Sequence, residues 1–386
     1  MYDVIIAGGG PGGLYAALCL AREGFHVGMV EEHSTTGEPV HCTGILADEA
    51  FDEFALSRRS ILNTVTTVRF YSPGGESIEY TTRRIEALVV DRRAFDEELA
   101  EEAAAAGVEI AHRRRVTDVA VASDAVRMTT ADGQSIRGRV AVLACGANYR
   151  LQRRLGLGMP SVFLQTAQME IPADRLADVE LHFGSAVAPK GFGWAVPVRR
   201  PSRPHVRVGI MCERDAARRF GRLVERVSGR WGIQVDPSWR PRQKMLPLAP
   251  IRRTYADRLL VVGDAAGLVK ATTGGGIYYS ILSGSIAADV LARALRTRNA
   301  GEDALREYEV RWRRRLDSEL QAQLSLRVLA QQLSDSEIES LFTLAKTNGV
   351  MPIVRRTASF NRHRGLILAL LRHPPVRQIL LRTLAS

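Results

Sequence analysis

Residues 2–13 read Tyr-Asp-Val-Ile-Ile-Ala-Gly-Gly-Gly-Pro-Gly-Gly, an apolar run that leads directly into a cluster of glycines. Gly8, Gly10 and Gly13 have the G-x-G-x-x-G spacing of a dinucleotide-binding turn, and Gly12 lies inside it. In such a turn the first glycine permits the tight bend, the second lets the backbone approach a pyrophosphate, and the third allows the next helix to pack closely. Because residues 14–23 have helical spacing, the stretch predicts a strand, a turn and a helix whose N-terminus attracts a pyrophosphate.

A second buried run, His26–Val30, ends at Glu31, 18 residues past Gly13. A carboxylate at the end of the second strand can accept a hydrogen bond from a ribose hydroxyl. The two strands, the turn, the helix and the acid together predict dinucleotide binding. An ordinary glycine turn between a strand and a helix is the alternative.

A second glycine-rich segment lies about 250 residues downstream. The apolar run Leu259–Val262 leads into Gly263-Asp264-Ala265-Ala266-Gly267, and Gly274-Gly275-Gly276-Ile277 then opens a long helix. The carboxylate in this loop can accept hydrogen bonds from a polyol such as a ribityl chain, and the helix N-terminus can face the N1/C2 carbonyl edge of a reduced flavin. A simple nicotinamide dehydrogenase needs no such second loop, so the two motifs together predict FAD.

The rest of the chain predicts two further parts. Strand-like runs near 163–171, 178–183, 192–198 and 205–212 indicate an antiparallel sheet, and the chain after Gly301 reads as helical and basic. The expected fold class is α/β, with a Rossmann-type FAD-binding domain, an antiparallel β-sheet substrate domain and a C-terminal helical region. The expected boundaries are 1–64, 84–158 and 250–300 for the first domain, 65–83 and 159–249 for the second, and 301–386 for the third.

The net charge of +11 comes almost entirely from arginine, because only four residues are lysine: Lys190, Lys244, Lys270 and Lys346. No basic stretch interleaved with aromatic residues is present, so nucleic acid is not an expected partner. An anionic membrane surface or a phosphorylated substrate fits this charge better.

The four cysteines lie far apart, with no CxxC pair and no histidine at zinc spacing, so neither a disulfide framework nor a metal site is expected. No apolar run reaches the ~20 residues of a membrane span. We expect a cytoplasmic protein, or one placed peripherally at the inner face of the membrane.

The glycine fingerprint, Glu31, Arg92-x-x-Phe95-Asp96 and the Gly263–Gly267 loop resemble the p-hydroxybenzoate hydroxylase superfamily of flavoproteins. Within that superfamily the chain is most similar to the geranylgeranyl reductase family. The segments that carry this likeness are Pro39-Val40-His41-Cys42-Thr43-Gly44, then Ala188-Pro189-Lys190-Gly191-Phe192-Gly193-Trp194-Ala195-Val196-Pro197, and Lys270-Ala271-Thr272-Thr273-Gly274-Gly275-Gly276-Ile277. The resemblance runs over nearly the whole chain.

The resemblance implies a p-hydroxybenzoate hydroxylase-like FAD enzyme that saturates isolated double bonds of polyprenyl chains on lipids, chlorophyll side chains or quinones. It places the loop from Pro39 to Gly44 beside the isoalloxazine, with Cys42 and His41 as the candidate catalytic residues. Arg92 is expected near the flavin or its phosphates. Phe192, Trp194 and Pro197 are expected to line an apolar substrate tunnel.

One departure from the superfamily pattern leaves the identity of the reductant open. Cys145-Gly146-Ala147-Asn148 stands where an Asp-Gly pair is usual, so a carboxylate expected near the cofactor is missing. NADPH and another electron donor are therefore both candidates.

Rival interpretations stay open at this stage. A flavin monooxygenase could use the same fold, whereas a halogenase would be expected to have a tryptophan where Phe192 stands. A redox-responsive binding protein is the non-enzymatic alternative. Cys42 could equally be a small buried hydrophobe, Phe192 and Trp194 plain sheet core, and residues 363–384 a helical pair rather than a lipid-facing surface.

Overall fold

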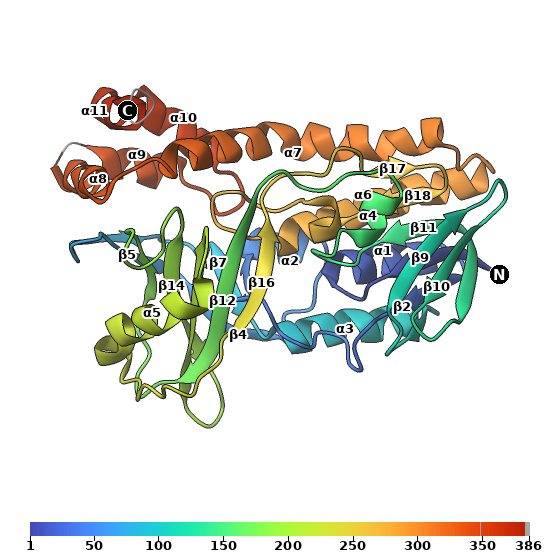
Figure 1. Ribbon diagram of the computed structural model, residues 1–386, viewed down its shortest axis with the longest axis horizontal. Helices are drawn as coiled ribbons and strands as arrows, with labels where there is room; N and C mark the ends of the chain where they lie inside the picture. Colours follow the sequence, from blue (N-terminus) through green and yellow to red (C-terminus); the bar gives the residue numbers. More distant parts are fainter. Residues whose placement is uncertain (348, 383–386) are drawn as a thin grey trace. The chain divides into compact units, whose positions relative to one another are not determined.

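The computed structural model describes residues 1–347 and 349–382, with side chains through residue 380 (Figure 1). Residues 383 and 384 of the basic tail considered above lie outside this part of the chain. The chain divides into two compact units. The first unit contains Met1–Val40, Asp91–Val162 and Pro247–Leu320, and the second contains His41–Val90, Phe163–Leu246 and Gln321–Ser386.

A largely parallel sheet forms the centre of the first unit. Its strands follow the order β17-β18-β11-β1-β2-β8, in which β1, β2, β8, β11 and β18 pair in parallel and β17 pairs antiparallel with β18. β9 and β10 extend β11 as an antiparallel meander. The strand bounds are β1 Tyr2–Ala7, β2 Val27–Val30, β8 Glu109–Ala111, β9 Val116–Val121, β10 Val126–Thr130, β11 Ser135–Leu143, β17 Tyr255–Ala256 and β18 Leu259–Val261.

Helices α1 and α6 make the closest helix packing in the first unit. A Cβ added to Gly284 of α6 would overlap the carbonyl oxygen of Gly12, and a Cβ added to Gly12 would lie 2.8 Å from the carbonyl oxygen of Ser280. Glycine at both positions therefore allows the two backbones to touch. The helices of this unit are α1 Pro11–Arg22, α3 Arg92–Ala105, α4 Arg150–Arg154, α6 Ile277–Arg296 and the first part of α7 Glu302–Ala330.

A seven-stranded sheet, in the order β16-β12-β15-β14-β13-β5-β6, forms the centre of the second unit. Its long strands pair antiparallel, as the sequence predicts, and β5 and β6 form a hairpin. The strand bounds are β5 Thr67–Tyr71, β6 Ser77–Thr81, β12 Phe163–Pro172, β13 Val179–His182, β14 Phe192–Arg199, β15 Pro204–Cys212 and β16 Arg242–Pro247.

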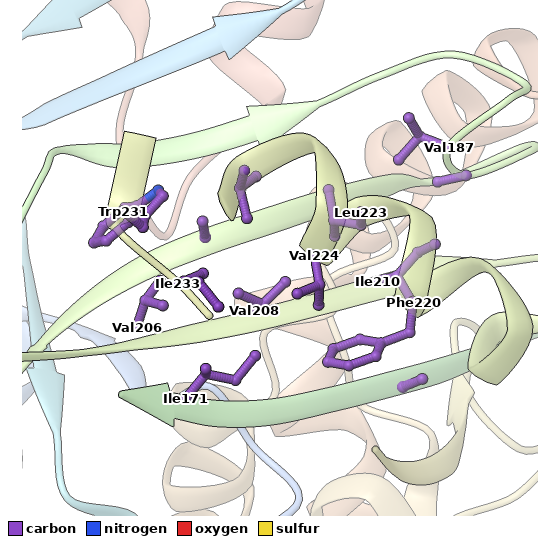
Figure 2. Close-up of a cluster of buried hydrophobic side chains, with 14 of the residues drawn as sticks. Ile171, Val187, Val206, Val208, Ile210, Phe220, Leu223, Val224, Trp231 and Ile233 are labelled. Carbon is purple, nitrogen blue, oxygen red and sulfur yellow. The ribbon is translucent and has the colours of Figure 1, made fainter. Parts of the chain in front are cut away.

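Helix α5 (Ala216–Trp231) covers one face of this sheet, and the sequence analysis did not predict it. Figure 2 shows Phe220, Leu223, Val224 and Trp231 of the helix against apolar side chains of the strands. This one-sided apolar stripe is what an amphipathic helix needs to dock on a sheet.

A smaller three-stranded sheet, in the order β3-β7-β4, belongs to the second unit together with the short helix α2 (Asp48–Glu53). Its strands are β3 Ile45–Ala47, β4 Ile61–Val65 and β7 Ala87–Val90. Residues 41–64 and 84–90 were expected in the cofactor domain, but their hydrogen bonds form this separate sheet, and they group with the second unit.

The C-terminal helices are α8 Asp335–Thr347, α9 Val350–Thr357, α10 Arg364–Arg372 and α11 Pro374–Arg382. Gly349 is the N-cap of α9, and α11 begins at Pro374. Val350, Val376 and Leu380 form the small core that these helices share. Within the described ranges, every helix is too short or too polar to cross a membrane.

We expect the substitution Gly284→Ala to destabilise the protein. The added methyl group would overlap the Gly12 carbonyl where α1 meets α6, and overpacking of this kind costs about 1–3 kcal/mol. Gly221→Ala is the matched control, because Gly221 is exposed on α5 with no heavy atom within 4 Å, and it should raise stability by roughly 0.5–1 kcal/mol. Thermal unfolding followed by circular dichroism measures both changes. A Gly284→Ala protein as stable as the wild type would contradict the close packing.

Candidate functional site

The first glycine turn joins β1 to α1 and has the features of a pyrophosphate site. Gly8 has φ +106°, and a Cβ there would overlap the carbonyl oxygen of Ala144, so only glycine fits. Gly10 is the N-cap of α1, receives no side-chain cap, and has no heavy atom within 4 Å of where a Cβ would lie. The turn therefore offers open space above uncapped helical N–H groups, the arrangement that binds phosphate.

Gly12 and Gly13 occupy the first turn of α1 and are both buried. The Cα of Gly13 packs against the carbonyl oxygen of Gly8, and that of Gly12 against α6. Their amide groups still belong to a helical turn that has no intrahelical acceptor. Both glycines thus allow close packing, and their N–H groups can donate hydrogen bonds to an anion.

Glu31 lies at the end of β2 with 7% of its surface exposed. Its Oε2 accepts a hydrogen bond from the Gly9 amide at 2.7 Å, and its Oε1 accepts from the amide and Nδ1 of His33 at 2.9 and 2.5 Å. These bonds fix the carboxylate beside the first turn. Because a carboxylate has about four acceptor positions, a ribose hydroxyl can still bond to it.

The second glycine loop connects β18 to α6. Gly263 and Asp264 belong to a short 3-10 helix (Gly263–Ala266), and the Gly263 amide donates to Ser283 Oγ at 3.0 Å. Gly276 is the N-cap of α6, Ile277 is its first residue, and Asp264 Oδ1 lies 2.8 Å from where a Gly276 Cβ would be. The carboxylate is thus placed at the positive end of a 20-residue helix.

A lysine lines the same loop. The turn is closed by hydrogen bonds from the Gly274 amide to the Lys270 carbonyl and from the Lys270 amide to the Gly275 carbonyl. The Lys270 side chain is 2% exposed, and its Nζ lies 5.8 Å from the centre of the Tyr279 ring and 4.0 Å from where a Gly275 Cβ would be. A buried ammonium group beside a helix N-terminus favours an anionic ligand.

The two glycine motifs meet at one residue of α6. Ser280 contacts Gly12 through its carbonyl oxygen and lies 2.7 Å, through its Oγ, from where a Gly263 Cβ would be. β1, β11 and β18 are adjacent parallel strands, so the turns that follow them emerge at the same edge of the sheet. Segments about 250 residues apart in the sequence therefore form one site in the first unit.

Two residues that the sequence analysis missed support the second loop. Tyr149 donates its hydroxyl proton to the Asp264 carbonyl at 2.6 Å, and Gln152 donates from Nε2 to the Ala265 carbonyl at 3.1 Å. Gln152 is fully buried, and burial raises the pKa of Tyr149 above its ordinary value. A lone glutamine in the arginine-rich stretch 150–154 was the only signal that the sequence offered.

Arg92 opens helix α3 and forms an ion pair with Asp96, with Nη2 to Oδ2 at 2.8 Å and Nε to Oδ1 at 3.3 Å. The two side chains are 13% and 6% exposed. The Arg-x-x-Phe-Asp motif is thus an (i, i+4) pair that holds its arginine in a fixed orientation.

The Cys42 loop belongs to the second unit. The Gly44 amide donates to Cys42 Sγ at 3.4 Å, the Gly44 carbonyl accepts from the Val90 amide at 2.8 Å, and Thr43 Oγ1 donates to Gln168 Oε1 at 3.0 Å. Cys42 and its neighbour His41 are both half-buried. The thiol therefore lies in a loop that is bonded to β7 and to β12.

The predicted substrate residues all lie on β14 in the second unit. Phe192 and Trp194 face the same side, with ring centres 5.9 Å apart and planes at 61°. The indole of Trp194 lies over Gly209 of β15, where any side chain would overlap it. Pro197 was expected beside them, but it is buried and its odd spacing from Trp194 places it on the opposite face of the sheet. Both half-exposed rings thus present an apolar surface on one face of the sheet.

Further aromatic rings extend this surface. Phe183 lies 6.0 Å from Phe192, 6.5 Å from Phe70 and 6.3 Å from Phe342 of α8, between ring centres. The sequence analysis missed these three, because they come from segments far apart in the chain.

Known proteins match the chain over most of its length. The family model described as lycopene cyclase protein matches residues 3–345. A digeranylgeranylglycerophospholipid reductase of Methanocaldococcus jannaschii is 29% identical over 359 residues, covering 88% of this chain and 90% of the reductase. Another, of Methanothermobacter thermautotrophicus, is 30% identical over 356 residues with the same coverage.

Solved structures agree on the fold. A geranylgeranyl bacteriochlorophyll reductase-like protein of Thermoplasma acidophilum has a TM-score of 0.85 at 24% identity, covering 99% of both chains. Flavin-dependent monooxygenases and halogenases share the fold at lower scores. Because the family model matches most of its length, the chain belongs to the lycopene cyclase protein family. Through relatives that are 29% and 30% identical, it belongs to the geranylgeranyl reductase family of FAD-dependent oxidoreductases.

Proposed function

We propose that this protein binds FAD and uses it to saturate isolated double bonds of a polyprenyl chain of geranylgeranyl type on a lipid, chlorophyll-type or quinone substrate. The observation that carries the proposal is the meeting of the two glycine motifs at Ser280, which builds one dinucleotide site with two ends. The two relatives described above, which are digeranylgeranylglycerophospholipid reductases, support the substrate class.

The residues of the first unit fit FAD. Gly10 and the first turn of α1 would hold the pyrophosphate, Glu31 the adenosine ribose, and Asp264 the ribityl chain. The N-terminus of α6 and Lys270 would face the pyrimidine edge. Arg92, held by Asp96, is the further candidate for the phosphates or the flavin.

For this reaction the second unit would have to supply a proton donor and an apolar pocket. Reduced FAD, when bound, supplies a hydride from N5 to one alkene carbon. An isolated alkene is not polarised, so a proton donor must stand ready at the other carbon in a pocket without water. Cys42, with His41 beside it as a relay, is the candidate donor. Phe192 and Trp194 would form the apolar wall that excludes water.

The electron donor is NADPH or another reductant. Cys145 occupies the place of the usual aspartate, and burial raises the pKa of its thiol to about 11, so it stays neutral at physiological pH. The site therefore lacks a negative charge that the wider superfamily has there.

Photoreduced enzyme kept free of oxygen should be reoxidised by a lipid that carries geranylgeranyl chains, because the alkene accepts the hydride. Loss of the reduced-flavin spectrum and a product heavier by two hydrogens per bond measure this, and the fully saturated lipid is the control. Reduced flavin that persists with geranylgeranyl lipids and with menaquinone would contradict the proposal.

A flavin monooxygenase is the alternative function, since solved monooxygenases share the fold. A product that requires oxygen, with peroxide formation stimulated by the substrate, would favour it. Redox-dependent binding of a partner without turnover would favour a non-enzymatic role instead.

We further propose that the C-terminal helices contact an anionic membrane. Residues 340–386 contain seven arginines and one lysine but no aspartate or glutamate, so they carry eight of the eleven net positive charges. The three acids just before this segment, Asp335, Glu337 and Glu339, accept hydrogen bonds from the amides of Ser185, Ser334 and Gly74 at 2.8, 2.8 and 2.5 Å. Within the segment, Lys346 pairs with Glu76 and Arg362 with Glu49.

Four basic side chains of these helices face solvent. Arg355, Arg356, Arg372 and Arg377 are exposed and form no ion pair among the residues that the structure describes, and Leu368 is 37% exposed beside them in sequence. Exposed arginines next to apolar side chains fit the headgroup region of an anionic bilayer.

Replacing Arg355, Arg356 and Arg372 by Gln should weaken binding to phosphatidylglycerol vesicles by up to about 100-fold, at about 1 kcal/mol per arginine. The matched control replaces Arg214, Arg218 and Arg222, three exposed arginines on or before α5. Co-sedimentation with vesicles at low and high salt measures both variants. Equal losses in the two variants, or equal binding to phosphatidylcholine, would refute this surface.

A further inference from the structure

A single buried arginine holds the Cys42 loop. Arg207 lies on β15, is 3% exposed, and faces Glu170 of β12 in the paired strands. Its Nε donates to Glu170 Oε2 at 2.9 Å, while its Nη1 donates to the carbonyl oxygens of Thr43 at 2.6 Å and of Val90 at 2.8 Å. One guanidinium group therefore joins the large sheet to the residue after Cys42 and to the end of β7.

The Glu170 carboxylate beside Arg207 accepts hydrogen bonds from two arginines. Arg200 donates to Glu170 at 2.7 and 3.0 Å. Burial raises the pKa of Glu170, but the hydrogen bonds and charges of Arg200 and Arg207 outweigh this effect, and the pKa lies below its ordinary value. The acid is thus ionised at neutral pH and keeps the Arg207 side chain oriented toward the loop.

Arg207 shares its face of the sheet with Phe192 and Trp194. In the strand pairing, Val196 lies opposite Arg207 and Trp194 lies opposite Gly209, and side chains two residues apart on a strand face the same side. Gln168, the partner of Thr43, lies opposite Gly209 on the other neighbouring strand. The loop that carries Cys42 and the strand that carries Trp194 are therefore fixed to one short stretch of β15.

A pair that only stabilised the sheet would direct its donors to the sheet. Two of the Arg207 hydrogen bonds instead go to main-chain carbonyls, those of Thr43 and Val90. These two residues flank the hydrogen bond from the Val90 amide to the Gly44 carbonyl, which joins the Cys42 loop to β7. A planar guanidinium group can serve a carboxylate and two carbonyls at once, whereas a lysine ammonium group lacks this fixed fork.

We propose that Arg207 is a positioning residue, which sets the place of the Cys42 thiol through the Thr43 and Val90 carbonyls. This inference rests on the proposed function, in which Cys42 serves the reduction. Loss of Arg207 should release the loop while leaving the FAD site of the first unit intact.

The direct test measures the thiol without any substrate. In FAD-loaded protein, the rate of Cys42 alkylation by iodoacetamide, followed by peptide mass mapping, should rise at least fivefold in Arg207→Met. In Arg207→Lys, Cys42 should be alkylated at a rate between those of the wild type and of Arg207→Met. Cys19 on α1 serves as the internal reference thiol. Glu170→Gln should move the rate in the same direction, and it replaces Arg207→Met if that variant does not fold.

The matched control is Arg230→Met. Arg230 holds another buried carboxylate of the same unit, Glu180, at 2.9 and 2.8 Å, and among the described residues it makes no hydrogen bond to the Cys42 loop. An equal rise in Arg230→Met, or an unchanged rate in folded Arg207→Met, would overturn the inference.

Turnover separates this inference from the proposed function. With an active polyprenyl substrate, Arg207→Met should lower kcat at least tenfold while KM changes less than threefold. If the wild type reduces no alkene, the proposed function fails, whereas the alkylation rates still decide whether Arg207 positions Cys42.

Discussion

The close contact between α1 and α6 is the constraint on which the cofactor site depends. Gly12, Gly284 and Ser280 let the two helix backbones touch, and the same contact brings the turn after β1 beside the loop after β18. Both helix N-termini then serve one site, so their partial positive charges act on a single ligand. A side chain at either glycine would separate the two turns and divide the site.

The second unit brings the Cys42 loop and an apolar surface to the same sheet. Gln168 accepts a hydrogen bond from the Thr43 hydroxyl, and Arg207, held by Glu170, donates to the Thr43 carbonyl. Aromatic rings cover the neighbouring part of the sheet. An apolar surface beside one fixed polar group is what the proposed protonation of an unpolarised alkene would require.

Local motifs could be predicted from the sequence because their residues are close together in the chain. The glycine turn, the second loop, the β5–β6 hairpin and the antiparallel strands all carry short-range signals. Tyr149, Gln152 and Arg207 could not be found in this way, since their roles come from contacts with residues 37–164 positions away. Helix α5 was missed although Phe220, Leu223, Val224 and Val227 have helical spacing, because the surrounding region is rich in prolines and β-branched residues.

The most direct measurement of the central claim is the binding of FAD to purified protein, followed by visible absorbance after removal of unbound flavin. If the two glycine motifs form one dinucleotide site, the protein will be yellow and hold one FAD per chain, and FMN, which lacks the adenosine half that Glu31 would bind, will be retained poorly. Protein that stays colourless after mixing with FAD, or that holds FMN as well as FAD, would contradict the account.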